Sequence, residues 1–415
     1  MSNGKNTLVK RFCRLACASA IALAASGVQA AETVTIGFTG PLSGGAALYG
    51  QNTLEGLQMA AREINDKGGF KVGDETYEIN LVSLDDKYAP SQAAVNGKRL
   101  VQQYNAPVIF TPHSGGTFAL QAFNQRDDFL VMSYTSVPTV TEKGNELTVR
   151  IPPTFTGYMK PFTKIAMAEN GKKVAIANAT HDYAKYWTKA FVPTWEAMGG
   201  TVVADNPMDY NKSADFYTGV SKVLAEKPDV LFIGGASEPT ALVAKQARQL
   251  GFKGGFVIMD QAKMGEMSKI IGGYKMLEGS VGVVPLTMYE EQGAKDFVAK
   301  YHKQNDGKDP TTEVAYNYFA MHTVIQAMKE AGTVADSKAI RAAMGDALKN
   351  LAEEHNPYGV TEIDAKGGMM ADPNIATVKK GGTVELQRFS EVLGEKPGEE
   401  KKQGAWRPVF LARFK

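Results

Sequence analysis

The chain has 415 residues, of which 44% are hydrophobic and 22% charged, and its formal net charge is +2. This composition is typical of a globular protein long enough to bury the cores of two domains. The 46 basic residues are nearly balanced by 44 acidic residues and form no basic cluster. We therefore exclude a nucleic-acid partner, because such binding depends mainly on neutralising phosphates with Lys and Arg.

The first thirty residues have the pattern of an export signal. Four basic residues precede an apolar run from Leu15 to Val28, and Val28-Gln29-Ala30 follows as a cleavage site; the basic residues are Lys5, Lys10, Arg11 and Arg14. The run is about 14 residues long, which is shorter than the roughly 20 residues of a membrane-spanning helix. We expect residues 1–30 to be removed as a signal peptide, so that the mature chain starts near Ala31. A lipoprotein site at Cys17 is the alternative, although its cysteine opens the apolar run.

Cysteine usage limits the chemistry of the mature chain. Cys13 and Cys17 are the only cysteines, and both lie in the predicted signal peptide. We therefore expect no disulfide, no thiolate metal ligand and no cysteine nucleophile. The stability of the mature protein must come from its apolar core.

Short β-rich runs alternate with helical patterns along the chain, which predicts βαβ repetition. The helical patterns have apolar residues three and four positions apart, as in Leu54, Leu57, Ala60, Ala61 and Ile64. The predicted strands are 33–38, 78–84, 107–111, 129–134, 173–177, 201–204, 229–234 and 256–259. Strands joined by crossover helices form parallel sheets that are covered on both faces, so we predict a doubly wound α/β architecture.

Pro152 and Pro153 interrupt this order, because two prolines oppose both a helix and a central strand. We predict a hinge there. The strand and helix order resumes after the hinge and continues to about residue 285, and helices are predicted at 294–303, 314–331 and 337–351. Gly381-Gly382, between two alternating runs, predicts a hairpin turn.

Four strand ends carry residues suited to binding a small ligand. In an open parallel sheet, ligands bind beyond the carboxyl ends of the strands. The four segments are 39–50, which is rich in glycine and contains Tyr49; 111–117, with His113, Ser114 and Gly115; 133–138, with Tyr134 and Ser136; and 259–261, with Asp260. Hydroxyls and free backbone amides bind anions, and tyrosines provide flat walls. Each segment also has a structural interpretation, since Ser114, Ser136 and Asp260 can be helix caps and Tyr49, Tyr134 and Tyr183 can be packing residues.

The sequence gives little support for an enzyme. It contains neither G-x-G-x-x-G nor G-x-x-x-x-G-K-[ST], the loops that hold phosphates of cofactors. Pro112-His113-Ser114-Gly115-Gly116 lacks the first glycine of G-x-S-x-G, and adjacent residues seldom form a Ser-His pair. The five histidines form no H-E-x-x-H motif or close pair. We predict a protein that is not an enzyme and that needs no cofactor and no metal.

Several segments resemble the leucine/isoleucine/valine-binding type of periplasmic solute-binding protein, which has fold type I. These segments are TIGFTGPLSGGAALYGQNTLEGLQMAAREINDKGG, LVSLDDKYAPSQAAVNGKRLV, TPHSGGTFAL, SYTSVPTVTEKG and DFYTGVSKVLAEKPDVLFIGGASEPTALVAKQARQLGF. Together they cover most of residues 33–285, and the resemblance is weaker beyond them.

The resemblance implies two similar lobes joined by three crossovers, with the ligand in the cleft between them. Lobe one would be 31–150 plus 286–355, and lobe two 151–285 plus 356–415. Closure of the lobes around the ligand would create the form that an ABC-type permease in the inner membrane recognises. We accordingly expect a monomeric periplasmic protein of a transport system, with a small molecule and the permease as partners.

The resemblance also implies roles for single residues. The loop 113–116 and Ser136 would bind the carboxylate of an amino acid, the carbonyl of Tyr134 would accept from its ammonium, and Asp260 would supply the counter-charge. Tyr49 and Tyr183 match aromatic positions of the cleft. The sequence departs from the family pattern at three positions: Gly115 replaces a serine, Ala236 replaces a tyrosine, and Asp260 is shorter than the usual Glu.

These departures leave the ligand open. An amide, urea or an aromatic carboxylate is the alternative to a branched-chain or related amino acid, and Phe155 and Tyr316 are further candidates for the cleft lining. A ligand-sensing receptor domain would use the same fold. A secreted hydrolase based on Ser114 is a third hypothesis from the residues alone.

Overall fold

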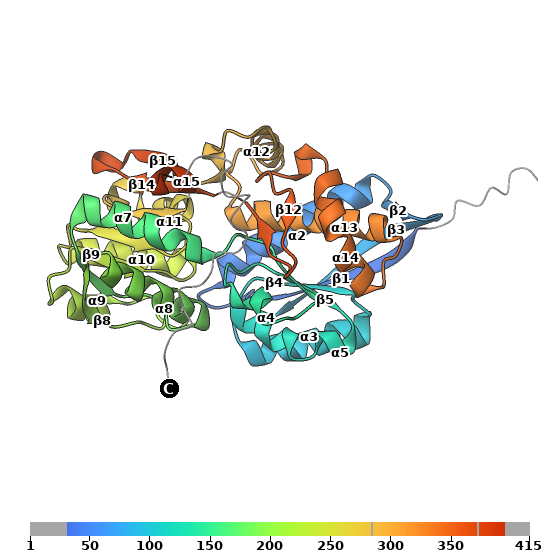
Figure 1. The fold of residues 1–415 in the computed structure, drawn as a ribbon, viewed down its shortest axis with the longest axis horizontal. Helices are drawn as coiled ribbons and strands as arrows, with labels where there is room; N and C mark the ends of the chain where they lie inside the picture. The colour runs from blue at the N-terminus through green and yellow to red at the C-terminus, as the bar shows by residue number, and fades with distance from the viewer. Residues whose placement is uncertain (1–30, 284, 372, 395–415) are drawn as a thin grey trace, which may run out of the picture.

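The computed structural model describes residues 31–283, 285–371 and 373–394, and these residues form two lobes, each built on one sheet (Figure 1). The predicted signal peptide and both cysteines lie outside the described residues. Among the helices of the described part, none combines the length and the apolar character needed to span a membrane.

The first sheet has six strands in the order β2-β3-β1-β4-β5-β6. All neighbouring strands are parallel except β2, which pairs antiparallel with β3. The strands are β1 (Glu32–Gly40), β2 (Phe70–Val72), β3 (Glu75–Asp85), β4 (Val108–Thr111), β5 (Leu130–Ser133) and β6 (Thr148–Arg150).

Helices cover both faces of this sheet, as a doubly wound sheet requires. Val108 and Phe110 of β4 pack in one apolar cluster with the first described helix and with helices between residues 292 and 350, whereas Ile109 between them packs in another. The first cluster contains α2 (Ala47–Asp66), α12 (Gln292–Gln304), α13 (Thr312–Ala331) and α14 (Ser337–Asn350). The second cluster contains α3 (Pro90–Tyr104) and α4 (Ser114–Gln121), and α5 (Asn124–Asp127) and α6 (Thr139–Glu142) complete the lobe.

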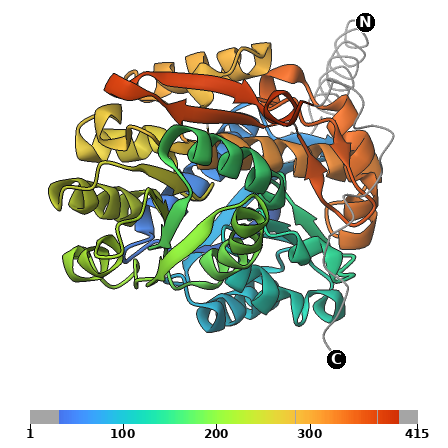
Figure 2. The same cartoon turned by 60° about the vertical axis from the view of Figure 1, so that its left-hand side comes forward.

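The second sheet has seven strands in the order β15-β14-β11-β10-β9-β7-β8. The strands are β7 (Lys173–Ile176), β8 (Thr201–Asp205), β9 (Val230–Ile233), β10 (Gly255–Ile258), β11 (Val281–Val283), β14 (Asn374–Val378) and β15 (Val384–Arg388). The five strands from β7 to β11 are parallel, and β14 and β15 add an antiparallel hairpin at the β11 edge, shown in red in Figure 2. Gly381 and Gly382 turn this hairpin at φ values of 85° and 93°, which confirms the predicted turn.

Five helices and short turns of the second lobe separate or follow its strands. The five helices are α7 (Met159–Asn170), α8 (Asp182–Ala197), α9 (Tyr217–Leu224), α10 (Ser237–Gln249) and α11 (Met264–Ile271). The short helical turns are η1 (Phe155–Tyr158), η2 (Tyr274–Leu277) and η5 (Lys380–Gly382), and the short helix α15 (Phe389–Leu393) follows β15. The largest apolar cluster of this lobe centres on buried aromatic residues such as Trp187, Phe191 and Phe232.

The chain passes between the two sheets three times. The first crossing contains Pro152 and Pro153, directly after β6, where the hinge was predicted. The second follows β11 and leads through η3 (Leu286–Met288) into α12. The third leads from β13 (Met369–Met370) to β14, so the fold has the three crossovers that the resemblance implied.

The third crossing lies later in the chain than we expected. The family resemblance implied a return to lobe two at residue 356, but Tyr358, Val360 and Met369 pack in the apolar cluster of the first lobe. The short strands β12 (Glu362–Ile363) and β13 pair with each other, after η4 (Glu353–His355), and Arg150 donates its backbone N–H to Gly367 O. We therefore propose that lobe one extends to about residue 371, because its core continues to that point.

Candidate functional site

A cavity lies between the lobes, at the carboxyl ends of strands from both sheets. About 310 Å³ of space not filled by atoms lies within and in front of it, part of which is open to solvent. Loops after β4, β5 and β10 contribute most of its wall, which is the place that an open parallel sheet offers to a ligand. The lining residues are Tyr49, Tyr88, Pro112, His113, Tyr134, Thr135, Ser136, Pro152, Tyr183, Asp260, Gln261 and Lys263.

Asp260 is a buried residue in the wall of this interlobe cavity and accepts hydrogen bonds from both lobes. Ser136 of the first lobe donates its hydroxyl to Oδ2 of Asp260 at 2.5 Å. From α8 of the second lobe, Trp187 Nε1 donates to Oδ1 at 3.0 Å, and the Tyr183 hydroxyl donates to the same oxygen. These donors hold the carboxylate in a fixed orientation and connect the lobes through it.

Burial raises the pKa of Asp260 to about 6, because the charged form loses its hydration. The nearby Lys263 ammonium and the hydrogen bond from Ser136 both act in the opposite direction. Asp260 as a whole is only 9% exposed, so the charge state of its carboxyl group depends on what occupies the cavity beside it. A cationic ligand group there would favour the ionised form.

Tyr49 reaches across the first lobe from the first turn of α2. Its hydroxyl donates to Pro112 O at 2.6 Å and lies 3.4 Å from Tyr134 O. The rings of Tyr49 and Tyr134 are 6.2 Å apart, and both side chains are buried. The Tyr134 carbonyl therefore already has one long contact with a protein donor.

His113 is fixed by hydrogen bonds at both ring nitrogens. Its Nδ1 accepts from Gly116 N at 2.9 Å and so caps α4, and Nε2 lies 2.9 Å from Oδ2 of the buried Asp86. Because Nδ1 is an acceptor, we infer that the proton is on Nε2 and is donated to Asp86. The ring of Tyr88 stacks on His113 at 4.6 Å, so only part of the imidazole faces the cavity.

Of the nine residues predicted to bind ligand, six line the cavity: Tyr49, His113, Tyr134, Ser136, Tyr183 and Asp260. Within the described residues, Ser114, Gly115 and Ala236 are not part of its wall. Ser114 and Gly115 form the first turn of α4, where a Cβ on Gly115 would approach Pro90 Cγ to 2.7 Å. Ala236 precedes α10 and packs in the apolar cluster of the first lobe.

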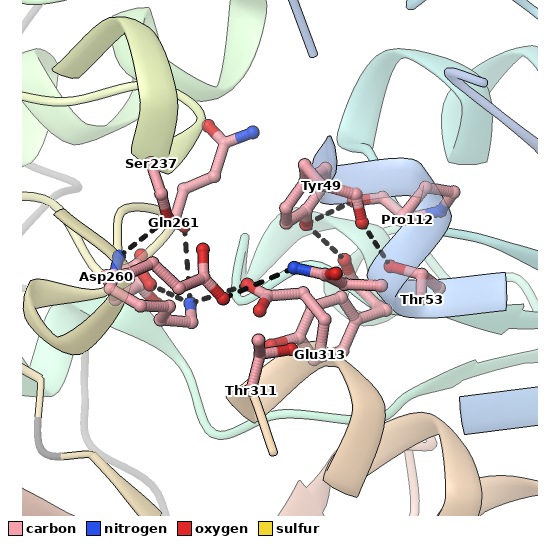
Figure 3. A network of polar contacts seen from close by, with 12 residues as sticks. Tyr49, Thr53, Pro112, Ser237, Asp260, Gln261, Thr311 and Glu313 are labelled. Atoms are coloured by element: carbon pink, nitrogen blue, oxygen red, sulfur yellow. Dashed lines mark hydrogen bonds and ion pairs between the residues drawn. The ribbon is translucent and has the colours of Figure 1, made fainter. Parts of the chain in front are cut away.

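Sequence reasoning missed a second polar group beside Asp260. Lys263 Nζ forms an ion pair of 3.3 Å with Glu313 Oε1, and Asn52 Nδ2 donates to Glu266 Oε1 at 3.3 Å. Figure 3 shows this network, with Asp260 and Gln261 of the second lobe on one side and Glu313 at the start of α13 on the other. Burial and the charge of Glu313 raise the pKa of Glu266 well above its usual value.

Trp187 was also missed, although the sequence contains a signal for it. Trp187 lies four residues after Tyr183, so the two side chains share one face of α8 and both reach Asp260. Phe155, a weaker candidate, stacks on Trp187 at 5.3 Å and supports it from behind. Lys263 and Glu313 have no comparable signal, because their contact depends on how the lobes meet.

One cluster of potential metal ligands lies away from this cavity, formed by Glu63, His322 and His355 with ligand atoms within 4.8 Å of one another. The rings of His322 and His355 are stacked at 3.8 Å with 5° between their planes, so their nitrogen lone pairs run side by side and do not converge. Lys300 Nζ lies 3.3 and 3.1 Å from the two oxygens of Glu63. This cluster therefore already contains a cation, and we assign it a structural role.

Comparison with known proteins identifies the family. The family model for periplasmic binding proteins matches residues 33–383. The chain belongs to this family. Its members are solute-binding proteins, which confirms both the resemblance and the prediction that the chain is not an enzyme.

This periplasmic binding protein is similar to several characterised relatives. It is 24% identical over 364 residues to the leucine-, isoleucine-, valine-, threonine- and alanine-binding protein of Pseudomonas aeruginosa, with 87% of this chain and 93% of the relative covered. It is 25% identical over 320 residues to the Leu/Ile/Val-binding protein of Escherichia coli, with 75% and 83% covered.

Solved structures show the same fold. The isoleucine complex of the substrate-binding protein LivJ from Streptococcus pneumoniae superposes with a TM-score of 0.72 at 23% identity, covering 86% of this chain and all of that one. The benzoate complex of a solute-binding protein from R. palustris gives a TM-score of 0.72 at 19% identity and covers 86% and 96%. Structural neighbours with this fold therefore bind an amino acid in one case and an aromatic acid in another.

Proposed function

We propose that this protein captures a small amino acid in the interlobe cavity and delivers it to an ABC importer in the inner membrane. The observation that carries the proposal is the buried carboxylate of Asp260, which faces the cavity and contacts donors of both lobes. A buried carboxylate is a suitable partner for an ammonium group, because the ion pair forms where water is excluded. The relatives that bind aliphatic amino acids support this choice of ligand.

Each part of the ligand has candidate partners in the cavity wall. Asp260 would provide the counter-charge of the ammonium, and Tyr134 O a second acceptor. The carboxylate would bind near Ser136, whereas Ser114 and Gly115 at the start of α4, which the resemblance also implied, lie outside this wall. Ser136 now donates to Asp260, so ligand binding requires this hydroxyl to change its acceptor.

Closure of the lobes would complete the site and signal its occupancy. Contacts that join the lobes include Ser136 with Asp260 and Gln261 Nε2 with the Tyr88 hydroxyl at 2.7 Å. A ligand that bridges the same walls would stabilise the closed form, which is the form we expect the permease to recognise. We place this function in the periplasm, after removal of residues 1–30.

The experiment that tests this function compares Asp260→Asn with the unaltered protein by isothermal titration. The ligands are leucine, isoleucine, valine and alanine, with urea and with carboxylates that lack the amine. We expect Asp260→Asn to weaken amino-acid binding by about 30-fold or more, because truncating a buried charge pair costs at least about 2 kcal/mol. Asp182→Asn is the matched control, since Asp182 begins the same lobe's α8 but has a side chain that is 51% exposed.

Two outcomes would contradict the proposal. If Asp260→Asn bound the amino acid with unchanged affinity, Asp260 would have no part in holding the ammonium. If the unaltered protein bound only carboxylates without an amine, the ligand would be an aromatic acid of the kind that the benzoate-bound neighbour holds.

A further inference from the structure

A second cavity lies directly beside the first, and tyrosine is the most frequent residue in its wall. About 400 Å³ of space not filled by atoms lies within and in front of it, part of which is open to solvent, and it shares Tyr134, Pro152, Asp260 and Lys263 with the first cavity. Five tyrosines line it: Tyr134, Tyr158, Tyr289, Tyr316 and Tyr358. The two cavities therefore share one wall that includes the carboxylate proposed to bind the ligand's ammonium.

The tyrosine rings form flat and fixed walls. Tyr316 and Tyr358 are stacked with centroids 3.8 Å apart and planes at 10°, and Tyr289 meets Tyr358 edge-on at 5.4 Å. Tyr134 contacts Tyr316 at 5.9 Å with a tilt of 43°. Because these rings hold one another in place, they offer a preformed surface with both ring faces and ring edges.

The second cavity is also surrounded by all three crossings between the lobes. Pro152 and Pro153 belong to the first crossing, Val283 and Tyr289 flank the second, and Pro373 and Asn374 lie in the third. A group bound here would touch the segments that bend when the lobes move. Filling this cavity would therefore be linked to closure.

We propose that this tyrosine-lined cavity is a subsite for an aromatic ring, so that the ligand is an amino acid with an aromatic side chain. The proposal rests on the proposed function, because it takes the ligand's ammonium to be at Asp260, on the shared wall. From there the side chain would extend past Tyr134 into the second cavity. A planar ring fits between flat walls and meets ring edges favourably, whereas a branched aliphatic group is not planar.

The polar groups of the second cavity also favour an aromatic ring over a cation. Tyrosine rings alone would attract a quaternary ammonium. However, Lys263 belongs to the same wall, and the guanidinium of the buried Arg150 donates to the carbonyl of Pro152, which also lines the wall. Because Lys263 is paired with Glu313, the guanidinium of Arg150 is the charge that opposes a cationic side chain in this cavity, whereas a neutral ring or phenol has no such cost.

The test is isothermal titration of the purified protein with phenylalanine, tyrosine, leucine, 4-hydroxybenzoate and choline. We expect phenylalanine or tyrosine to bind at least tenfold more tightly than leucine. Tyr358→Leu should weaken the binding of that aromatic amino acid about five- to tenfold, the size of a typical ring pair, and leave leucine binding within twofold. Tyr358→Phe, which keeps the stacked ring, should retain most of the affinity and shows that the fold is intact.

The control is Tyr217→Leu, because Tyr217 lies on α9 and is 40% exposed. Leucine binding as tightly as phenylalanine and tyrosine would overturn the subsite and leave the amino-acid function standing. Tight binding of 4-hydroxybenzoate alone would overturn the ammonium role of Asp260 and leave the aromatic subsite standing. Tight binding of choline alone, or no binding by any of the five compounds, would overturn both.

Discussion

The ammonium nitrogen of Lys263 lies 3.3 Å from Oε1 of Glu313, and this buried ion pair joins the two lobes beside the ligand cavity. Lys263 precedes α11 of the second lobe, and Glu313 is in the first turn of α13. The Lys263 side chain is 10% exposed and the Glu313 side chain 0%. A pair with so little hydration stabilises the contact between the lobes only while both partners are present.

Removal of one partner should therefore destabilise the protein measurably. We expect Lys263→Met to lower the free energy of unfolding by about 2 kcal/mol. This loss is smaller than the loss on breaking an ion pair that stays buried, because opening of the lobes can hydrate Glu313. Lys185→Met is the control, since Lys185 pairs with Asp182 at the surface and its loss should cost less than about 0.5 kcal/mol. Urea unfolding measures both. Equal losses for the two variants would show that the Lys263 pair contributes no more than a surface pair.

The pKa of Asp260 predicts an unusual pH dependence of stability. Burial raises this pKa from 3.8 to about 6, so the folded protein holds the proton between about pH 4 and pH 6 while the unfolded chain releases it. Stability from this group therefore falls as the pH rises through that window, opposite to a salt-bridged aspartate. Asp260→Asn removes the titration, so its stability relative to the unaltered protein should increase by up to about 3 kcal/mol between pH 4 and pH 7.

Urea unfolding at pH 4, 5, 6 and 7 measures that difference between the two proteins. The raised pKa of Glu266 has the same sign but is present in both proteins, so to first order it cancels. A difference that is flat or that decreases with pH would show that Asp260 is better hydrated in solution than its 9% exposure suggests.

Much of the fold was predictable, because long regular elements leave a strong pattern. Most of the strands that the sequence predicted are buried apolar runs, and β9 and β10 are buried at every residue, whereas β3 and β8 are largely half-buried or exposed. The three-residue strands β2, β6 and β11 were missed, because three residues show no periodicity. The late third crossing was missed for the same reason, since β12 and β13 have two residues each.

The site was predictable only where local chain geometry decides the position. Ser136 and Asp260 follow predicted strands, and the end of a parallel strand faces the cleft whatever the rest of the chain does. Lys263 and Glu313 meet across 50 residues of sequence and two lobes, so no local pattern predicts their contact. Ser114 and Gly115 follow a strand as well, but there the helix begins at once and turns them away from the cavity wall.

His113 should matter for stability as well as for the cavity. His113→Ala would remove the cap of α4 and leave the buried Asp86 without one of its donors, so we expect a loss of about 2 to 3 kcal/mol in the free energy of unfolding. His113→Asn keeps a capping side chain and should recover about 1 kcal/mol of this loss. His302→Ala is the control, since His302 contacts Asp309 at the exposed surface. A similar small effect of both alanine variants would contradict the role assigned to His113.

Two glycines within helices of the first lobe should respond in opposite ways to alanine. A Cβ on Gly56 of α2 would lie 2.2 Å from Val314 O and 3.0 Å from Tyr318 N, because α2 and α13 approach each other there through their backbones. A Cβ on Gly345 of α14 would meet only Ile363 Cγ2, at 3.8 Å. We expect Gly345→Ala to raise the free energy of unfolding by about 0.5 to 1 kcal/mol, since alanine has the higher helix propensity.

Gly56→Ala should instead lower the free energy of unfolding by about 1 to 3 kcal/mol, because the methyl group can fit only if the two helices move apart. Helix propensity alone would make both alanine variants more stable. A free energy of unfolding that rises for Gly345→Ala and falls for Gly56→Ala would therefore report the close approach of α2 and α13. Urea unfolding of the two variants under identical conditions measures it. Stabilisation by both substitutions would mean that α2 and α13 lie further apart in solution. The start of α13, which carries Glu313, would then lie further from α2 as well.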